Sequence, residues 1–278
     1  MTEIFSAPLL HHDVAGWTTS AISGTKEMEA AAAIIAAAIA AAAAAAAAGS
    51  QQSEGLNALP QSDLRKVKAL DLNNEPESDL IGCVGKFVNL ILLRLGGCQL
   101  TAFPDVTRLI SLTHLVIDNN QLTRVPAELG RLGLLEQLHL NNNQLTSIPA
   151  ELGRLGSLKI LLLDNNRLTS VPAELGRLGS LEQLSLQNNR LTSIPAEFGN
   201  LESLETLHLF SNRLTSLPAE IENLGSLETL GLHNNPQLSK VPQALGRLQR
   251  RGVQLSYDGA YVTIGADSNN SYRIGDYL

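Results

Sequence analysis

Histidines and carboxylates recur in this sequence, and both residue types take part in metal binding and acid–base chemistry. The residues concerned are His114, His139, His208, His233, Asp118 and Asp164. Imidazole nitrogens and carboxylate oxygens are zinc ligands, and an imidazole titrates close to neutral pH. The six residues are spread from position 114 to position 233. Their chemistry therefore depends on the elements that bring them together.

Catalysis needs a more specific arrangement than these residues offer. The histidines lie in pairs without a third convergent ligand, so we expect no metal. The serines lack a neighbouring base with an orienting third group, and the sequence has no glycine-rich loop of the phosphate-binding kind. We therefore expect a protein that is not an enzyme and holds no cofactor. The imidazoles then serve as ordinary surface residues or as pH-sensitive contacts.

The net charge and the cysteine content restrict the kinds of partner and the cellular compartment that we expect. The chain has 278 residues, a net charge of −7 and a pI near 5.4. Proteins that bind nucleic acids present a basic stripe, so we expect no nucleic-acid partner. The two cysteines, Cys83 and Cys98, form no metal or disulfide-cap pattern, and Glu3 stands where a signal peptide has positive charge. These features predict a cytoplasmic protein.

The first 63 residues differ from the rest. Residues 1–29 have no sustained hydrophobic period and are expected to be disordered. Residues 30–48 contain only Ala and three Ile, which predicts a helix or low-complexity spacer, and residues 49–63 form a linker. A helix of the Ala run would reach about 28 Å, just enough to cross a membrane, although Ala adds little insertion energy. A membrane anchor therefore remains an alternative.

Residues 64–250 repeat with a period of 23, interrupted by one unit of 22 residues and one inserted residue near Pro236. The cleanest unit is LKILLLDNNRLTSVPAELGRLGS, residues 158–180. About eight units begin at Val67, Leu90, Leu112, Leu135, Leu158, Leu181, Leu204 and Leu227. Residues 251–278 leave the pattern and are expected to form a C-terminal cap and tail, in which Val253 and Leu255 suit a last strand.

Each unit predicts a strand, a turn and a short helical or irregular return. Leu161 and Leu163 have the alternate spacing of one strand face and point into the core, so Leu162 faces outward. Pro172 starts the return, because proline suits the first turn of a helix. A single unit buries too little apolar surface to offset the entropy of ordering it, so the units must stack. The strands then form a parallel sheet, and the bulkier returns curve it.

An asparagine follows the strand in six of the units. These residues are Asn120, Asn143, Asn166, Asn189, Asn212 and Asn235. A buried amide at a tight turn both donates to and accepts from the backbone of neighbouring units, so we predict a structural asparagine ladder. Cys98 takes this place in the second unit, and Glu75 in the first. Since Glu75 cannot be buried cheaply, the first unit is expected to be an end cap.

The outward strand positions predict a protein-binding concave face. Its residues are Leu92, Arg94, His114, Val116, Asp118, His139, Asn141, Ile160, Leu162, Asp164, His208, Phe210 and His233. Val116, Ile160, Leu162 and Phe210 are apolar where the pattern requires no apolar residue. An apolar cluster with a polar rim marks a partner site, although scattered exposed apolar residues are also ordinary.

Asp118 and Asp164 flank Asn141 two units apart on the same predicted face. The two carboxylates can receive a basic group of a partner, or they can serve only solubility. Both interpretations are open from the sequence.

The pattern LxxLxLxxNxLTxxPxxLGxL resembles the leucine-rich repeats of the intracellular Ras-group, or suppressor-of-Ras-like, class over about two thirds of the chain. The resemblance implies an α/β curved solenoid with a parallel sheet on the concave face and short returns on the convex face. It also implies a non-catalytic scaffold or adaptor of intracellular signalling. Its partner would be a protein such as a small GTPase or signalling enzyme, and we expect the chain to be monomeric. The alternative is a membrane-tethered, receptor-like protein anchored by the Ala/Ile run.

Overall fold

The computed structural model describes residues 64–75, 81–238 and 244–256. The predicted disordered segment 1–29, the Ala-rich segment 30–48 and the linker 49–63 lie outside the described residues, as does the tail beyond residue 256. Within the described ranges, no helix has the length and apolar character needed to span a membrane.

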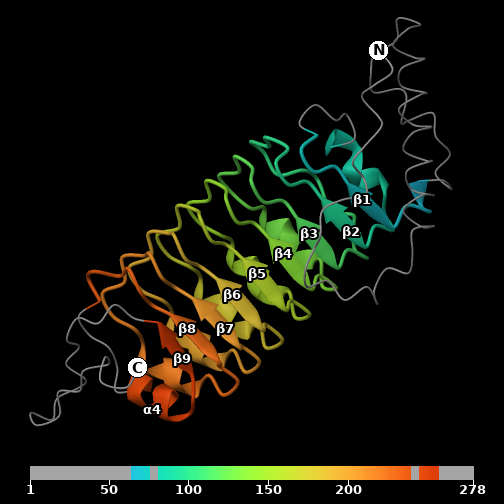
Figure 1. Ribbon diagram of the computed structural model, residues 1–278. Coiled ribbons are helices and arrows are strands. Elements are labelled where there is room, and N and C mark those ends of the chain that lie inside the picture. The colour runs from blue at the N-terminus through green and yellow to red at the C-terminus, as the bar shows by residue number, and fades with distance from the viewer. Residues whose placement is uncertain (1–63, 76–80, 239–243, 257–278) are drawn as a thin grey trace, which may run out of the picture.

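Nine strands of three residues form one parallel sheet, in which each strand pairs with the next in the sequence (Figure 1). The strands are β1 (Ala69–Asp71), β2 (Leu92–Arg94), β3 (His114–Val116), β4 (Gln137–His139), β5 (Ile160–Leu162), β6 (Gln183–Ser185), β7 (Thr206–His208), β8 (Thr229–Gly231) and β9 (Gln254–Ser256). The predicted curved parallel solenoid is confirmed, and β9 is the last strand expected at Val253–Leu255.

The register runs through the sheet without a slip. Leu161 at the centre of β5 aligns with Leu138 on one side and Leu184 on the other. The 22-residue unit does not disturb it, since Leu93 still aligns with Leu115. Equivalent residues of successive units therefore stack in straight columns, about 4.8 Å apart as in any parallel sheet.

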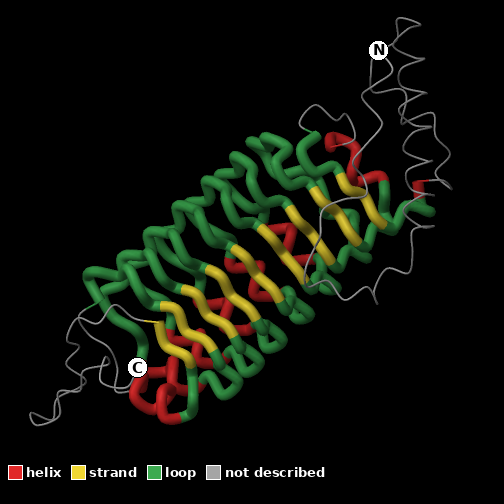
Figure 2. Tube along the Cα trace, viewed as in Figure 1, coloured by secondary structure: helices red, strands yellow, loops and turns green. Residues whose placement is uncertain are grey.

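Short 3-10 helices lie on the opposite side of the stack from the strands (Figure 2). They are η1 (Ile81–Lys86), η2 (Ala127–Arg131), η3 (Ala150–Arg154), η4 (Ala173–Arg177), η5 (Ala196–Asn200) and η6 (Ala219–Asn223). Pro172 precedes η4 with φ −70°, the angle that its ring imposes. One α-helix, α4 (Ala244–Arg250), follows near the C-terminal end of the sheet.

The return of the second unit contains no helix after Pro104. The Asp105 carboxylate there accepts hydrogen bonds from the backbone N–H and the hydroxyl of Thr107, at 3.1 and 2.6 Å. An aspartate bonded to the residue two positions on forms a local turn that competes with helix. This is the unit with 22 residues, so a tighter turn replaces the 3-10 helix.

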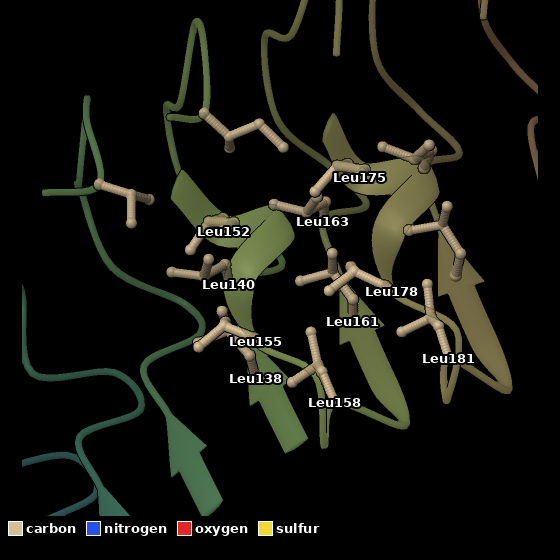
Figure 3. Close-up of a cluster of buried hydrophobic side chains, with 14 of the residues drawn as sticks. Leu138, Leu140, Leu152, Leu155, Leu158, Leu161, Leu163, Leu175, Leu178 and Leu181 are labelled. Carbon is tan, nitrogen blue, oxygen red and sulfur yellow. The ribbon is translucent and has the colours of Figure 1, made fainter. Parts of the chain in front are cut away.

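Leucines from the strands and the returns fill the space between them (Figure 3). Leu158, Leu161 and Leu163 from the strand side, Leu175 from η4 and Leu178 directly after η4 all have no measurable exposure. Each such side chain contributes about 1.5–3 kcal/mol when fully buried. The core is thus aliphatic and continuous from unit to unit, which fixes the direction of the outward strand side chains.

Close stacking of the returns requires glycine at one position. A Cβ on Gly153 would overlap the carbonyl oxygen of Glu174 in the next unit, and the same holds for Gly176 and Glu197. A Cβ on Gly156, in contrast, would meet nothing within 4 Å. The first glycine of each LGRLG segment therefore lets the convex side of the stack pack closely.

Candidate protein-binding face

The asparagine ladder lies along the edge of the sheet where the strands end, which we call the carboxyl edge. The Asn166 amide nitrogen donates to the carbonyl oxygens of Leu140 in the preceding unit and Leu163 in its own unit, both at 3.0 Å. Its side-chain oxygen accepts the N–H of Leu145 at 3.0 Å. The other ladder amides repeat this pattern, and all six are buried. Each amide therefore joins two units and holds their strand ends at a fixed separation.

Cys98 occupies the ladder position of the second unit. Its thiol donates to the carbonyl oxygen of Leu72 at 2.9 Å, which is the bond an asparagine makes to the preceding unit. Burial raises the pKa of the thiol, so it remains protonated and able to donate. Glu75, in the same position of the first unit, is exposed.

The residue before each ladder position turns the chain out of the strand. Asn165 has φ +54°, a left-handed conformation that asparagine tolerates better than most residues. The seventh unit has Ser211 there, with φ +55°. This turn ends the strands after three residues and separates the concave face from the carboxyl edge.

Twelve of the thirteen predicted face residues are partly exposed, as outward strand positions should be. The exception is Leu92, which is 5% exposed although it has the outward position between Ala69 and His114. Leu92 therefore offers almost no surface to a partner. Near it, Arg94 pairs with Asp71 at 3.2 Å, so its charge is already partly matched within the chain.

The four predicted apolar face residues do not form one patch. Val116, His139 and Leu162 occupy consecutive positions of one column, and Ile160 shares its strand with Leu162. Phe210 is separated from Leu162 by two units. We call Val116, His139, Ile160 and Leu162 the central patch.

His139 belongs to the central patch because it is neutral. Burial, together with the nearby positive charges of His114 and Arg94, lowers its pKa to about 4. At pH 7 the imidazole therefore carries no charge, and the column from Val116 to Leu162 contains no charged group. The same burial effect lowers the pKa of His114.

Phe210 lies in an aromatic cluster with His208 and His233. Its ring stacks on His233 with centroids 4.3 Å apart and is tilted against His208 at 5.7 Å. Gly231 makes room for the cluster, since a Cβ there would lie 3.1 Å from Phe210 Cδ1 and 3.3 Å from His208 Cδ2. Sequence reasoning missed Gly231, although a glycine at the outward strand position aligned with His208 was a visible signal.

Two residues after the ends of strands β3 to β6, four consecutive units form a row of oxygen acceptors: Asp118, Asn141, Asp164 and Gln187. Burial raises the pKa of both Asp118 and Asp164, while the amides of Asn119 and Asn165 donate to these carboxylates. Among the described residues, the buried side-chain oxygens of Asn141 and Gln187 have no hydrogen-bond donor. The partly exposed carboxylates of Asp118 and Asp164 therefore suit donor groups of a partner, whereas the Asn141 and Gln187 oxygens are covered. No cluster of three or more metal-ligating side chains occurs in the part of the chain that the structure describes.

Comparison with known proteins identifies the family. The profile described as leucine-rich repeat region matches residues 66–211, more than half of the chain, and leucine-rich repeats in two copies match residues 202–245. No curated protein matches the sequence.

Solved structures are similar to this chain. The leucine-rich-repeat ectodomain of the Arabidopsis thaliana membrane receptor kinase GASSHO1/SCHENGEN3, in complex with CASPARIAN STRIP INTEGRITY FACTOR 2, is 35% identical with a TM-score of 0.58. That match covers 69% of this chain but only 24% of the ectodomain. A leucine-rich-repeat protein of Leptospira interrogans is 29% identical with a TM-score of 0.49, over 77% of this chain and 66% of that one. By its repeat profiles, the chain belongs to the leucine-rich repeat family.

Proposed function

We propose that this chain is a non-catalytic module that binds a protein partner on its concave face. The observation that carries the proposal is the central patch, in which Val116, Ile160 and Leu162 remain partly exposed beside a neutral His139. The acceptor row of Asp118, Asn141 and Asp164 supplies a polar rim. Apolar centres with polar rims are the usual organisation of protein interfaces.

We also infer that the repeats are of the intracellular Ras-group class and that the module works in the cytoplasm as a monomeric scaffold or adaptor. The 23-residue period and the proline-started 3-10 returns support this class. A small GTPase or a signalling enzyme is accordingly the first partner to test.

The test is affinity capture with the double variant Leu162→Glu, Phe210→Glu. Buried carboxylates in an interface cost several kcal/mol when unpaired, so capture of the wild-type partners should be lost. The matched control is Ile110→Glu, Leu134→Glu, because these aliphatic side chains are 66% and 56% exposed and lie outside the concave columns. Capture that is unchanged in the first variant, or lost equally in both, contradicts the concave-face proposal.

A second candidate is a membrane-tethered, receptor-like protein. The similarity to a plant receptor ectodomain favours it. Fractionation of cells distinguishes the two: a tethered protein needs detergent for its release, whereas the proposed cytoplasmic module appears in the detergent-free supernatant.

A further inference from the structure

Three arginines form a row at the carboxyl edge of the sheet. Arg167, Arg190 and Arg213 directly follow the ladder asparagines of three consecutive units, and all are exposed. The backbone N–H of Arg190 donates to Leu168 and that of Arg213 to Leu191, both at 2.9 Å. Consecutive arginines therefore stand at about the 4.8 Å spacing of paired strands, over roughly 10 Å in all. We call these three residues the arginine row.

The fold does not require these charges. Gln144 has the same position one unit earlier and makes the same backbone bond, to Leu122 at 2.9 Å. Like charges at this spacing repel one another even in water. The row therefore adds repulsion at positions where this chain elsewhere uses a neutral side chain, which points to a role outside the fold.

The turns around the row carry no carboxylate, and Asp164, three residues before Arg167, accepts from the Asn165 amide. Residues 165–170, 188–193 and 211–216, which form the turns around it, contain no Asp or Glu. The ion pairs found among the described residues involve Arg94, Lys159 and Arg247, and none involves the row. The row is thus a local basic edge on a chain whose net charge is −7.

The arginines of the convex side are arranged differently. Arg131, Arg154 and Arg177 also recur in three consecutive units, but each ends a 3-10 helix that has a glutamate in its first turn. Opposite charges three residues apart on one helical turn neutralise each other locally. These three residues therefore match the arginine row in number and charge, but not in electrostatic surroundings.

The opposite edge of the same units is acidic. Glu182, Glu205 and Glu228 are exposed, and their backbones form a continuous row through bonds of 2.8 Å. Upstream of them, Glu136 is paired with Lys159 at 2.9 Å, but none of these three has such a partner among the described ion pairs. The concave face of these units thus lies between a basic edge and an acidic edge.

We propose that a carboxylate-rich segment of a protein partner docks along the arginine row, with the acidic edge opposite fixing its orientation. A guanidinium binds a carboxylate through two parallel hydrogen bonds. In an extended segment, side chains at alternate positions are about 6.7 Å apart, so two or three Asp or Glu residues at such positions span the row. The inference rests on the proposed function, because the row borders the concave face of the same units.

The experiment uses the full chain and a fluorescein-labelled peptide in which Glu alternates with Ser, with binding followed by fluorescence anisotropy. The test variant is R167Q/R190Q/R213Q, which copies the glutamine of the earlier units. The control is R131Q/R154Q/R177Q, which removes the same charge from the convex side. We expect the test variant to bind at least about tenfold more weakly and the control to change less than about twofold. Wild-type binding should weaken as salt is raised.

Equal binding by wild type and both variants overturns the proposal, as does an equal loss in both variants, which would reflect net charge alone. Tighter binding of a single-stranded oligonucleotide than of the peptide also overturns it, because the row would then serve a nucleic acid. Partner capture separates this inference from the proposed function. If Leu162→Glu, Phe210→Glu loses the partners but the arginine-row variant retains them, concave-face binding stands and the acidic-segment proposal fails.

Discussion

Replacing Asn166 by alanine should strongly destabilise the centre of the solenoid. The Leu145 N–H has the Asn166 side-chain oxygen as its partner, at 3.0 Å. The carbonyl oxygens of Leu140 and Leu163 each also accept from a neighbouring ladder residue, Asn143 and Asn189 respectively. The Asn166 amide also donates to the carbonyl oxygen of Asp164 at 3.2 Å, which keeps the Asn142 N–H. The substitution therefore leaves one buried N–H unpaired and removes one of two donors from three carbonyls.

The magnitude follows from these losses. A buried donor without a partner costs about 1–3 kcal/mol, and a carbonyl that keeps one of two hydrogen bonds loses a smaller amount. We expect Asn166→Ala to lower the free energy of unfolding by about 2–4 kcal/mol. Thr169→Ala, at an exposed position three residues on, should change it by less than about 0.5 kcal/mol.

Urea unfolding followed by circular dichroism measures both variants, and amide hydrogen exchange examines the Leu145 N–H directly. That amide should exchange much faster in Asn166→Ala, since its acceptor is gone. A loss below about 0.5 kcal/mol, or an unchanged exchange rate at Leu145, would refute the view that the ladder amides hold the units together.

Three further outcomes are expected. Gly153→Ala should cost about 1–3 kcal/mol because its Cβ would overlap the Glu174 carbonyl, whereas Gly156→Ala should be nearly neutral; equal melting temperatures would contradict this. Because burial lowers the folded pKa of His139 to about 4, below its unfolded value of about 6.5, stability should fall as the pH drops between these values, by at most about 1.4 kcal/mol per pH unit. Urea midpoints at pH 7 and pH 5 should differ less in His139→Gln than in wild type, and identical shifts would reject the assignment. Cys98, buried and with a raised pKa, should be alkylated in the native protein far more slowly than the partly exposed Cys83, as mass spectrometry of the modified peptides can show.

Periodicity alone predicted the stacked fold and the phase of every strand. The alternation of Leu161 and Leu163 fixes which side chains enter the core, and a 23-residue period repeats that choice in each unit. The same logic placed twelve of thirteen predicted face residues at partly exposed positions. These features depend on local spacing and on stacking between neighbouring units, and both can be inferred from a single sequence.

Features that depend on contacts between side chains of different strand positions, or on local competition between structures, were not predictable in this way. The burial of Leu92 does not follow from its outward strand position, and the Asp105 turn depends on a competition between two local structures. The stacking of Phe210 on His233 requires the space left by Gly231 in a different column. The neutral state of His139 likewise follows from its burial among neighbours in three dimensions.

The unbroken register also determines how the solenoid responds to force. Hydrogen bonds between parallel strands lie roughly along the stacking direction, so pulling the two ends of the sheet apart puts the same tension on every interface, and the interfaces open one at a time rather than shearing together. A unit that detaches releases 23 residues, which extend to about 75 Å. The gain in end-to-end length is this value minus the spacing of one strand. The asparagine ladder crosses six of these interfaces with its own bonds, whereas the first interface is crossed by the Cys98 thiol through one bond to Leu72. Mechanical unfolding should therefore advance in nearly equal steps from an end, with the ladder setting the resistance of the interfaces that it crosses.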